Sequence, residues 1–125
     1  MNGVEWYWNI EFSKHFICAH PIGTVLGKAD YGDHLCVYQG VTVGANFRGE
    51  ECIWPSIGNY VTLYANATVI GDARIGNNVI IAANAFVLNE IVPDNCVVFG
   101  SSPDLKIKLC SKAEIEDKLV RIWKL

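Results

Sequence analysis

The chain has 125 residues, of which 51% are hydrophobic and 18% charged. This balance excludes a disordered chain, and the length fits a single domain, 1–125, with one core. Its net charge of −3 argues against a nucleic-acid partner. No apolar run reaches the length of a membrane span, and residues 1–11 lack a signal-peptide pattern, so we expect a cytoplasmic protein with no membrane partner.

Five cysteines occur at wide spacings without a Cys-x-x-Cys pair: Cys18, Cys36, Cys52, Cys96 and Cys110. An odd, scattered set fits neither a disulfide scaffold nor a zinc knuckle, so we expect buried free thiols in a reducing compartment. A small chain with few charges would also leave apolar surface exposed as a single copy, which favours self-association.

The first 18 residues precede any clear repeat and are rich in aromatic side chains. We predict that this N-terminal cap segment, 1–18, plugs one end of the fold that follows and that its aromatics are mostly buried. These residues are Trp6, Tyr7, Trp8, Phe12 and Phe16.

From residue 19 onward, an apolar residue recurs at every sixth position in two series. A second small or apolar residue follows each of these marks by four positions, from Gly23 to Ile91. The marks are Ala19, Val25, Tyr31, Val37 and Val43, and then Ile57, Leu63, Val69, Ile75, Ile81 and Val87.

A period of six fits neither an α-helix nor a heptad, and it is typical of a solenoid built from short strands and turns. We interpret 19–99 as the stacked coils of an all-β parallel β-helix, with both sets of residues pointing inward. Glycines directly after the marks, such as Gly32, Gly58 and Gly76, suit tight corners. An antiparallel sandwich with an accidental period is the alternative that the two long series disfavour.

The two series are separated by a stretch that cannot keep the register of six. We therefore predict that about 44–56 leaves the solenoid as a loop. Loops on rigid scaffolds commonly carry function, although a tolerated insertion without a role is the alternative.

The C-terminal segment, 100–125, departs from the repeat. We predict a last strand over 96–99, a break at 100–103 and a helix from about 112 to 123, which begins with the capping box Ser111-Lys112-Ala113-Glu114. Its apolar face, including Ile115 and Leu119, should cover the open end of the solenoid or pack on a neighbouring chain.

These features resemble the hexapeptide-repeat acyltransferases, which are left-handed parallel β-helices. Two segments carry the resemblance to serine acetyltransferases, and more closely to the serine-acetyltransferase-like enzymes of surface-polysaccharide gene clusters. They are His20-Pro21-Ile22-Gly23-Thr24-Val25-Leu26-Gly27 and Val37-Tyr38-Gln39-Gly40-Val41-Thr42-Val43-Gly44. The resemblance implies a left-handed coil, a homotrimer, and active sites between neighbouring chains.

The resemblance also implies that coenzyme A lies along the groove between chains and that His20 is the general base. Imidazole has a pKa suited to taking a proton from an acceptor hydroxyl at neutral pH. A hydrogen-bonded structural histidine is the alternative for His20.

Carried over by position, the family's coenzyme A contacts fall on Ala45, Asn46, Ala65 and Ala83. Small residues there would let a pantetheine arm approach the backbone, although alanine also simply suits a corner. Lys106 follows a segment that looks like the family's last turn, where it would meet a nucleotide phosphate or be an ordinary solvated lysine.

Two positions depart from the family pattern for serine, and a third fits the family's acidic partner of the base. Trp54 stands where a substrate-binding histidine is usual, Ala19 replaces an acidic contact, and Glu5 takes the slot of the acidic partner of the base. Two serine contacts are therefore missing, which favours a sugar hydroxyl or amine as acceptor. Trp54 would stack on a sugar ring or, alternatively, pack in the core or the trimer.

The remaining histidines, His15 and His34, do not indicate a metal site. His34 is assigned to acceptor binding in the groove, with a plain surface histidine as the alternative, and His15 receives no role. A zinc site like that of γ-type carbonic anhydrases needs a close histidine pair, which the spacing of His15, His20 and His34 does not provide, so we expect no metal.

The resemblance thus implies an enzyme that transfers an acetyl group from acetyl-CoA, its co-substrate, to a small hydroxyl or amine acceptor, a sugar or an amino acid. It would act as a homotrimer and by direct transfer. The alternative is a non-catalytic trimeric β-helix with a structural or binding role.

Overall fold

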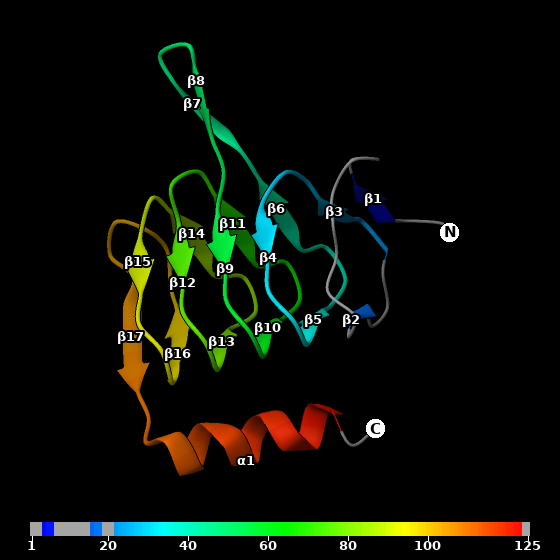
Figure 1. The fold of residues 1–125 in the computed structure, drawn as a ribbon, viewed down its shortest axis with the longest axis vertical. Coiled ribbons are helices and arrows are strands. Elements are labelled where there is room, and N and C mark those ends of the chain that lie inside the picture. Colours follow the sequence, from blue (N-terminus) through cyan, green and yellow to red (C-terminus); the bar gives the residue numbers. More distant parts are fainter. Residues whose placement is uncertain (1–3, 7–15, 19–21, 124–125) are drawn as a thin grey trace.

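The computed structural model describes residues 4–6, 16–18 and 22–123, and the side chains of 17 and 22–120. The described strands form three parallel sheets wound into a prism (Figure 1). Sheet A contains β1 (Val4–Trp6), β3 (Thr24–Leu26), β6 (Thr42–Gly44), β11 (Thr68–Ile70) and β14 (Phe86–Leu88). Sheet C contains β4 (Asp30–Tyr31), β9 (Ser56–Ile57), β12 (Arg74–Ile75) and β15 (Ile91–Val92).

Sheet B contains β2 (Phe16–Cys18), β5 (Leu35–Val37), β10 (Val61–Leu63), β13 (Val79–Ile81) and β16 (Cys96–Phe99), with β17 (Lys106–Leu109) antiparallel to β16. The chain visits sheets A, C and B in turn, so that every coil lies on the preceding one. This confirms the all-β solenoid. The antiparallel β17 was not predicted.

The core is a set of inward columns that run from coil to coil. Val61 pairs with Val79, and Val69 pairs with Val87, each one full coil of three six-residue repeats later. These inward side chains are fully buried. The predicted marks from Ile57 to Val87 therefore point inward, and their stacking supplies the apolar burial that stabilises the fold.

Three predicted inward positions are wrong, all where a coil is one residue shorter: Gly23, Val25 and Ile91. Val25 is 38% exposed because Leu26, and not Val25, pairs with Val43. Ile91 is 78% exposed, and Val92 takes its place inside. A slip of one residue exchanges the two faces of a strand, so each deletion puts the predicted inward positions beside it on the outer face.

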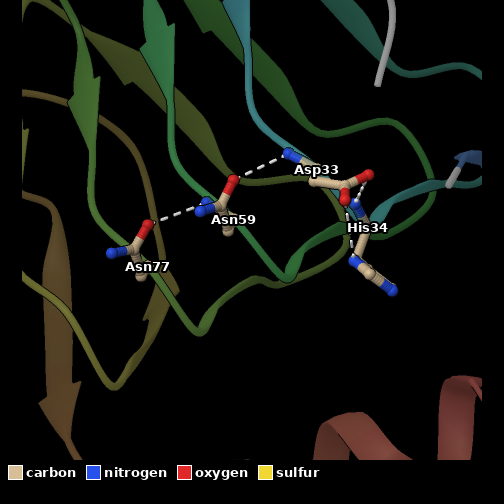
Figure 2. Close-up of polar contacts among 4 residues, drawn as sticks. All are labelled: Asp33, His34, Asn59 and Asn77. Carbon is tan, nitrogen blue, oxygen red and sulfur yellow. Dashed lines mark hydrogen bonds and ion pairs between the residues drawn. The ribbon is translucent and has the colours of Figure 1, made fainter. Parts of the chain in front are cut away.

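The corner between sheets C and B is held by a ladder of side-chain amides and carboxylates. The Asp33 N–H donates to Asn59 Oδ1 at 2.7 Å, and the Asn59 N–H donates to Asn77 Oδ1 at 2.8 Å (Figure 2). A Cβ on Gly58, at the same corner, would lie 2.5 Å from the Gly76 carbonyl oxygen. The close approach of successive coils therefore requires glycine at this position.

The chain leaves the prism between β6 and β9, within the predicted 44–56, but as a β-hairpin and not as an irregular loop, and Gly44 and Ser56 still belong to the prism. The strands of the hairpin are β7 (Asn46–Arg48) and β8 (Glu51–Ile53). Figure 1 shows the hairpin projecting from the edge between sheets A and C, away from the C-terminal helix.

The helix α1 (Lys112–Trp123) begins with the predicted capping box, in which the Glu114 N–H donates to Ser111 Oγ at 3.2 Å. Ile115 and Leu119 are buried against Cys36 and Ile80 on the outer face of sheet B. The helix therefore lies along a side of its own prism (Figure 1), so the prediction that it covers an open end of the solenoid is wrong, whereas packing on a neighbouring chain stays a prediction. The apolar outer face of sheet B attracts it there.

The aromatics of the predicted N-terminal cap fall outside the residues or side chains that the structure describes. Cys36 and Cys96 are buried as expected, whereas Cys52 and Cys110 are half-buried. Burial raises the pKa of the Cys96 thiol to about 11. Within the described residues, no helix has the length and apolar character needed to cross a membrane.

Two buried threonines should respond oppositely to the same substitution. Thr62 and Thr24 are both fully buried, but Thr62 Oγ1 has no hydrogen-bond partner among the described residues, whereas Thr24 Oγ1 donates to the Tyr38 carbonyl oxygen at 2.9 Å. Thr62→Val should raise the free energy of unfolding by about 1 kcal/mol, and Thr24→Val should lower it by about the same amount. Thermal unfolding of both variants checks this, and a fall in both would contradict it.

Candidate functional site

Two residues of the predicted site, His20 and Ala19, lie outside the described residues. β2 ends just before them at Cys18, which pairs with Val37 of the next coil. Glu5 lies in β1, paired with Val25, and its side chain is not described. The described part of the site begins at the corner that leads from sheet B to sheet A.

Ala65 and Ala83 occupy equivalent places at this corner in consecutive coils. The Asn84 N–H donates to the Ala65 carbonyl oxygen at 2.9 Å, which stacks one corner on the other. Asn66 and Asn84 take φ values of 62° and 63°, in the left-handed region that asparagine tolerates. Ala65 is half-buried and Ala83 is exposed. The corner therefore presents a strip of small side chains and backbone.

Lys106 lies at the C-terminal end of the same corner. The Gly100 carbonyl oxygen accepts from the Phe86 N–H at 2.9 Å, which continues the stack beyond Ala83. A Cβ on Gly100 would lie 3.8 Å from Lys106 Cγ. The Lys106 side chain is exposed, so it adds a cation to the end of the strip.

Ala45 and Asn46 lie at the opposite edge of sheet A, where β6 leads into the hairpin. Asn46 opens β7, and its Oδ1 accepts from the Phe47 N–H at 2.9 Å. Because the strands of sheet A separate this edge from the corner of Ala65 and Ala83, the four predicted coenzyme A contacts do not form one site within a protomer.

His34 lies at the corner between sheets C and B, on the far side of sheet B from Ala65. Its ring stacks on Tyr60, with ring centroids 4.2 Å apart, and Nδ1 lies 3.4 Å from Asp33 Oδ2. Figure 2 shows the ring turned away from the amide ladder. Within a protomer, sheet B therefore separates His34 from the corner of Ala65 and Ala83.

A cavity of about 310 Å³ lies between this corner and α1. Its lining combines apolar side chains with one amide and one carboxylate: Tyr60, Asn78, Glu116, Leu119 and Val120. Nothing in the repeat pattern predicted this cavity, because it depends on where α1 packs.

Trp54 lies at the base of the hairpin, 38% exposed, with Lys28 Nζ 4.6 Å from the centre of its ring. It lines a cleft of about 220 Å³, hereafter the hairpin-base cleft. The other lining residues are Asp30, Cys52, Ile53, Ser56, Asp72 and Arg74. Sequence reasoning missed Asp30, Ser56 and Arg74, although each directly precedes an inward mark and so had to point outward.

Asp72 joins the hairpin to the next coil. Its Oδ2 lies 3.7 Å from Arg48 Nη2 of β7, and its Oδ1 lies 3.5 Å from Arg74 Nε of β12. The guanidinium groups are mostly exposed, so each pair contributes little to the stability of the whole chain. Together they tie a projecting hairpin to the rigid prism.

The described residues contain no group of three or more side chains suited to holding a metal ion. Near the hairpin-base cleft, burial raises the pKa of the Tyr31 hydroxyl. The Tyr31 hydroxyl donates to the Gly27 carbonyl oxygen at 2.6 Å, which gives Tyr31 a structural role in β4.

The sequence of this chain is similar to those of known transferases. Residues 55–89 match the family described as "Bacterial transferase hexapeptide (six repeats)". The serine acetyltransferase of Synechococcus elongatus is 36% identical over 101 residues, which cover 80% of this chain and 41% of that protein. The chain is similar to hexapeptide-repeat transferases over these residues, and to serine acetyltransferases in sequence and fold.

Solved structures agree with the sequence comparison. The serine acetyltransferase of Neisseria gonorrhoeae superposes with a TM-score of 0.77 at 25% identity, covering 92% of this chain and 45% of that one. A serine acetyltransferase in complex with CoA superposes with a TM-score of 0.63 at 23% identity, covering 85% of this chain and 40% of that one. These neighbours are left-handed β-helices, which gives the coil its hand. The chain spans about two fifths or less of the length of these curated relatives.

Neutralising Asp72 should loosen the hairpin without unfolding the prism. Asp72→Asn removes the charge shared by Arg48 and Arg74, so amide hydrogen exchange in β7 and β8 should speed up. The free energy of unfolding should fall by less than about 1 kcal/mol. Glu116→Gln, which removes an exposed ion pair on α1, is the control and should leave hairpin exchange unchanged. Equal amide hydrogen exchange in β7 and β8 of the two variants would contradict the role of Asp72 in holding the hairpin against the prism.

Proposed function

We propose that this protein is an acetyltransferase that uses acetyl-CoA and transfers the acetyl group directly to a small hydroxyl or amine acceptor, a sugar or an amino acid. The observation that carries the proposal is the stacked strip of Ala65 and Ala83 in a serine acetyltransferase-like β-helix. A relative named serine acetyltransferase and a structural neighbour in complex with CoA support the same chemistry.

The strip suits the pantetheine arm of coenzyme A. Ala65 and Ala83 leave the backbone of successive corners accessible, and a chain-like ligand can follow them from coil to coil. The exposed Lys106 at the end of the strip offers a cation for a nucleotide phosphate. We propose no metal, because activation of the acceptor is assigned to a side chain.

The side chain that activates the acceptor is that of His20, which acts as the general base. An acceptor hydroxyl attacks a thioester poorly unless a base takes its proton as the new C–O bond forms. The thiol of coenzyme A then leaves from the tetrahedral intermediate, whose oxyanion needs a fixed donor such as a backbone N–H. The similarity of 20–27 to the family motif supports the assignment.

We propose that the protein works as a homotrimer in the cytoplasm. The outer face of sheet A carries Ile70, Phe86 and Leu88, all half-buried, between the coenzyme A strip and the hairpin. Packing of copies through this side would place the strip of one protomer beside the hairpin of the next. Ala45, Asn46 and Trp54 would then join Ala65 and Ala83 across the interface.

The acceptor is proposed to be a sugar hydroxyl or amine before free L-serine. Trp54 and Ala19 replace two polar contacts to serine, whereas an indole suits the apolar C–H face of a sugar ring. The closer likeness to enzymes of surface-polysaccharide clusters stays a prediction. The same two replacements favour the second candidate, a trimeric β-helix without catalysis.

Release of free thiol from acetyl-CoA tests the proposal, with amino sugars, sugar alcohols and L-serine as acceptors. The wild-type protein should turn over with at least one of them, and His20→Ala should lower kcat by about 10²–10⁴-fold. Coenzyme A should still raise the melting temperature of His20→Ala, since the base does not hold the cofactor. Equal turnover by His20→Ala would remove the base assignment, and absence of both turnover and a thermal shift would favour the non-catalytic reading.

Blocking the strip tests the coenzyme A site by itself. At about a hundredfold excess over its Kd, coenzyme A should stabilise the wild-type protein by about 2.7 kcal/mol. Ala83→Leu places a branched side chain on the strip and should abolish most of that thermal shift. Ala113→Leu, on the exposed face of α1, should keep it. A full thermal shift in Ala83→Leu would mean that coenzyme A binds elsewhere.

A further inference from the structure

Three polar side chains form a row along the outer face of sheet C. Asp30 pairs with Ser56, and Ser56 pairs with Arg74, in three successive coils. Parallel strands lie about 4.8 Å apart, so neighbouring residues of the row present a carboxylate, a hydroxyl and a guanidinium at that spacing. Because all three point away from the core, they serve no packing function.

The hairpin turns this row into a cleft. Its return strand and the turn that follows bring Cys52, Ile53 and Trp54 to the side of the row, and Asp72 closes it at the corner. The hairpin-base cleft of about 220 Å³ is smaller than the pockets that enclose drug-sized ligands. It therefore suits a ligand with a single ring.

The charges around the cleft are mostly balanced before any ligand arrives. Arg74 is paired with Asp72, and Lys28 lies over the Trp54 ring. The two carboxylates that line the cleft, of Asp30 and Asp72, oppose an anionic ligand. What remains is a mixed lining of hydrogen-bond acceptors and donors beside an indole.

We propose that the hairpin-base cleft binds one pyranose ring. Hydroxyl groups both donate and accept, so one sugar can donate to the Asp30 carboxylate and accept from the Arg74 guanidinium. Ser56 lies between them and serves either direction. The exposed part of the Trp54 indole contacts the apolar C–H face of the ring. Binding requires no acetyl transfer, so it can be tested separately from the proposed activity.

Saturation-transfer NMR on the full chain tests the proposal, with methyl glucopyranoside, methyl galactopyranoside and methyl 2-amino-2-deoxyglucopyranoside as probes and no coenzyme A present. At least one probe should bind with a Kd on the order of 1 mM, as expected of a shallow site. Trp54→Ala should weaken binding by about tenfold or more, and Asp30→Asn should also weaken it. Phe47→Ala, which removes a 69% exposed aromatic from the same hairpin, should leave it unchanged.

Several outcomes would overturn the inference. They are absence of binding by all three pyranosides, binding that survives in Trp54→Ala, and binding that Phe47→Ala abolishes to the same extent. Saturation of the cleft by L-serine, with loss of the pyranoside signal at equal concentration, would also overturn it. The thermal shift with coenzyme A monitors the strip of Ala65 and Ala83 independently, so failure of sugar binding is distinguishable from failure of the proposed transferase.

Discussion

The coil-on-coil stacking of inward side chains is the constraint on which the rest of the structure depends. Val69 packs between Val43 and Val87 in one column, and all three are buried. Each column requires that a coil return to the same point after its three strands. The chain can therefore vary only where it does not disturb that return, which is at the corners and on the outer faces.

The hairpin shows how this constraint positions the residues of the proposed site. Although 46–53 are inserted into one coil, Val43 still pairs with Val69 across it, and Tyr31 still pairs with Ile57. A corner accepts additional residues because closing a longer loop costs little free energy, whereas an additional residue inside a strand would turn its side chains over. The strip of Ala65 and Ala83 also lies at a corner. Both proposed sites thus use positions that the core leaves free.

Much of the fold followed from the spacing of apolar residues, because the repeat records which side chains must meet. The capping box predicted the start of α1 for a similar reason, since Ser111 and Glu114 act locally. The one-residue deletions that expose Val25 and Ile91 were not predictable, because a shortened turn leaves no distinct residue type. The position of α1 depended on the outer face of sheet B, where Cys36 and Ile80 face outward in a pattern that the inward marks do not record. The grouping of Asp30, Ser56 and Arg74 required knowledge of which strands pair.

The three faces of the prism differ in ways that narrow how copies of the chain could meet. α1 covers the middle of sheet B and buries Cys36, Thr62 and Ile80 beneath it, whereas β17 at the edge of that sheet stays exposed. Sheet C presents the polar row of Asp30, Ser56 and Arg74, whose desolvation in a tight interface would be costly. Sheet A presents apolar and small side chains that are only half-buried. An interface through sheet A would bury apolar surface at little polar cost, and it lies between the two corners that carry the proposed cofactor strip and the hairpin. Packing of copies through sheet A would therefore bring the proposed cofactor strip of one protomer beside the hairpin of the next.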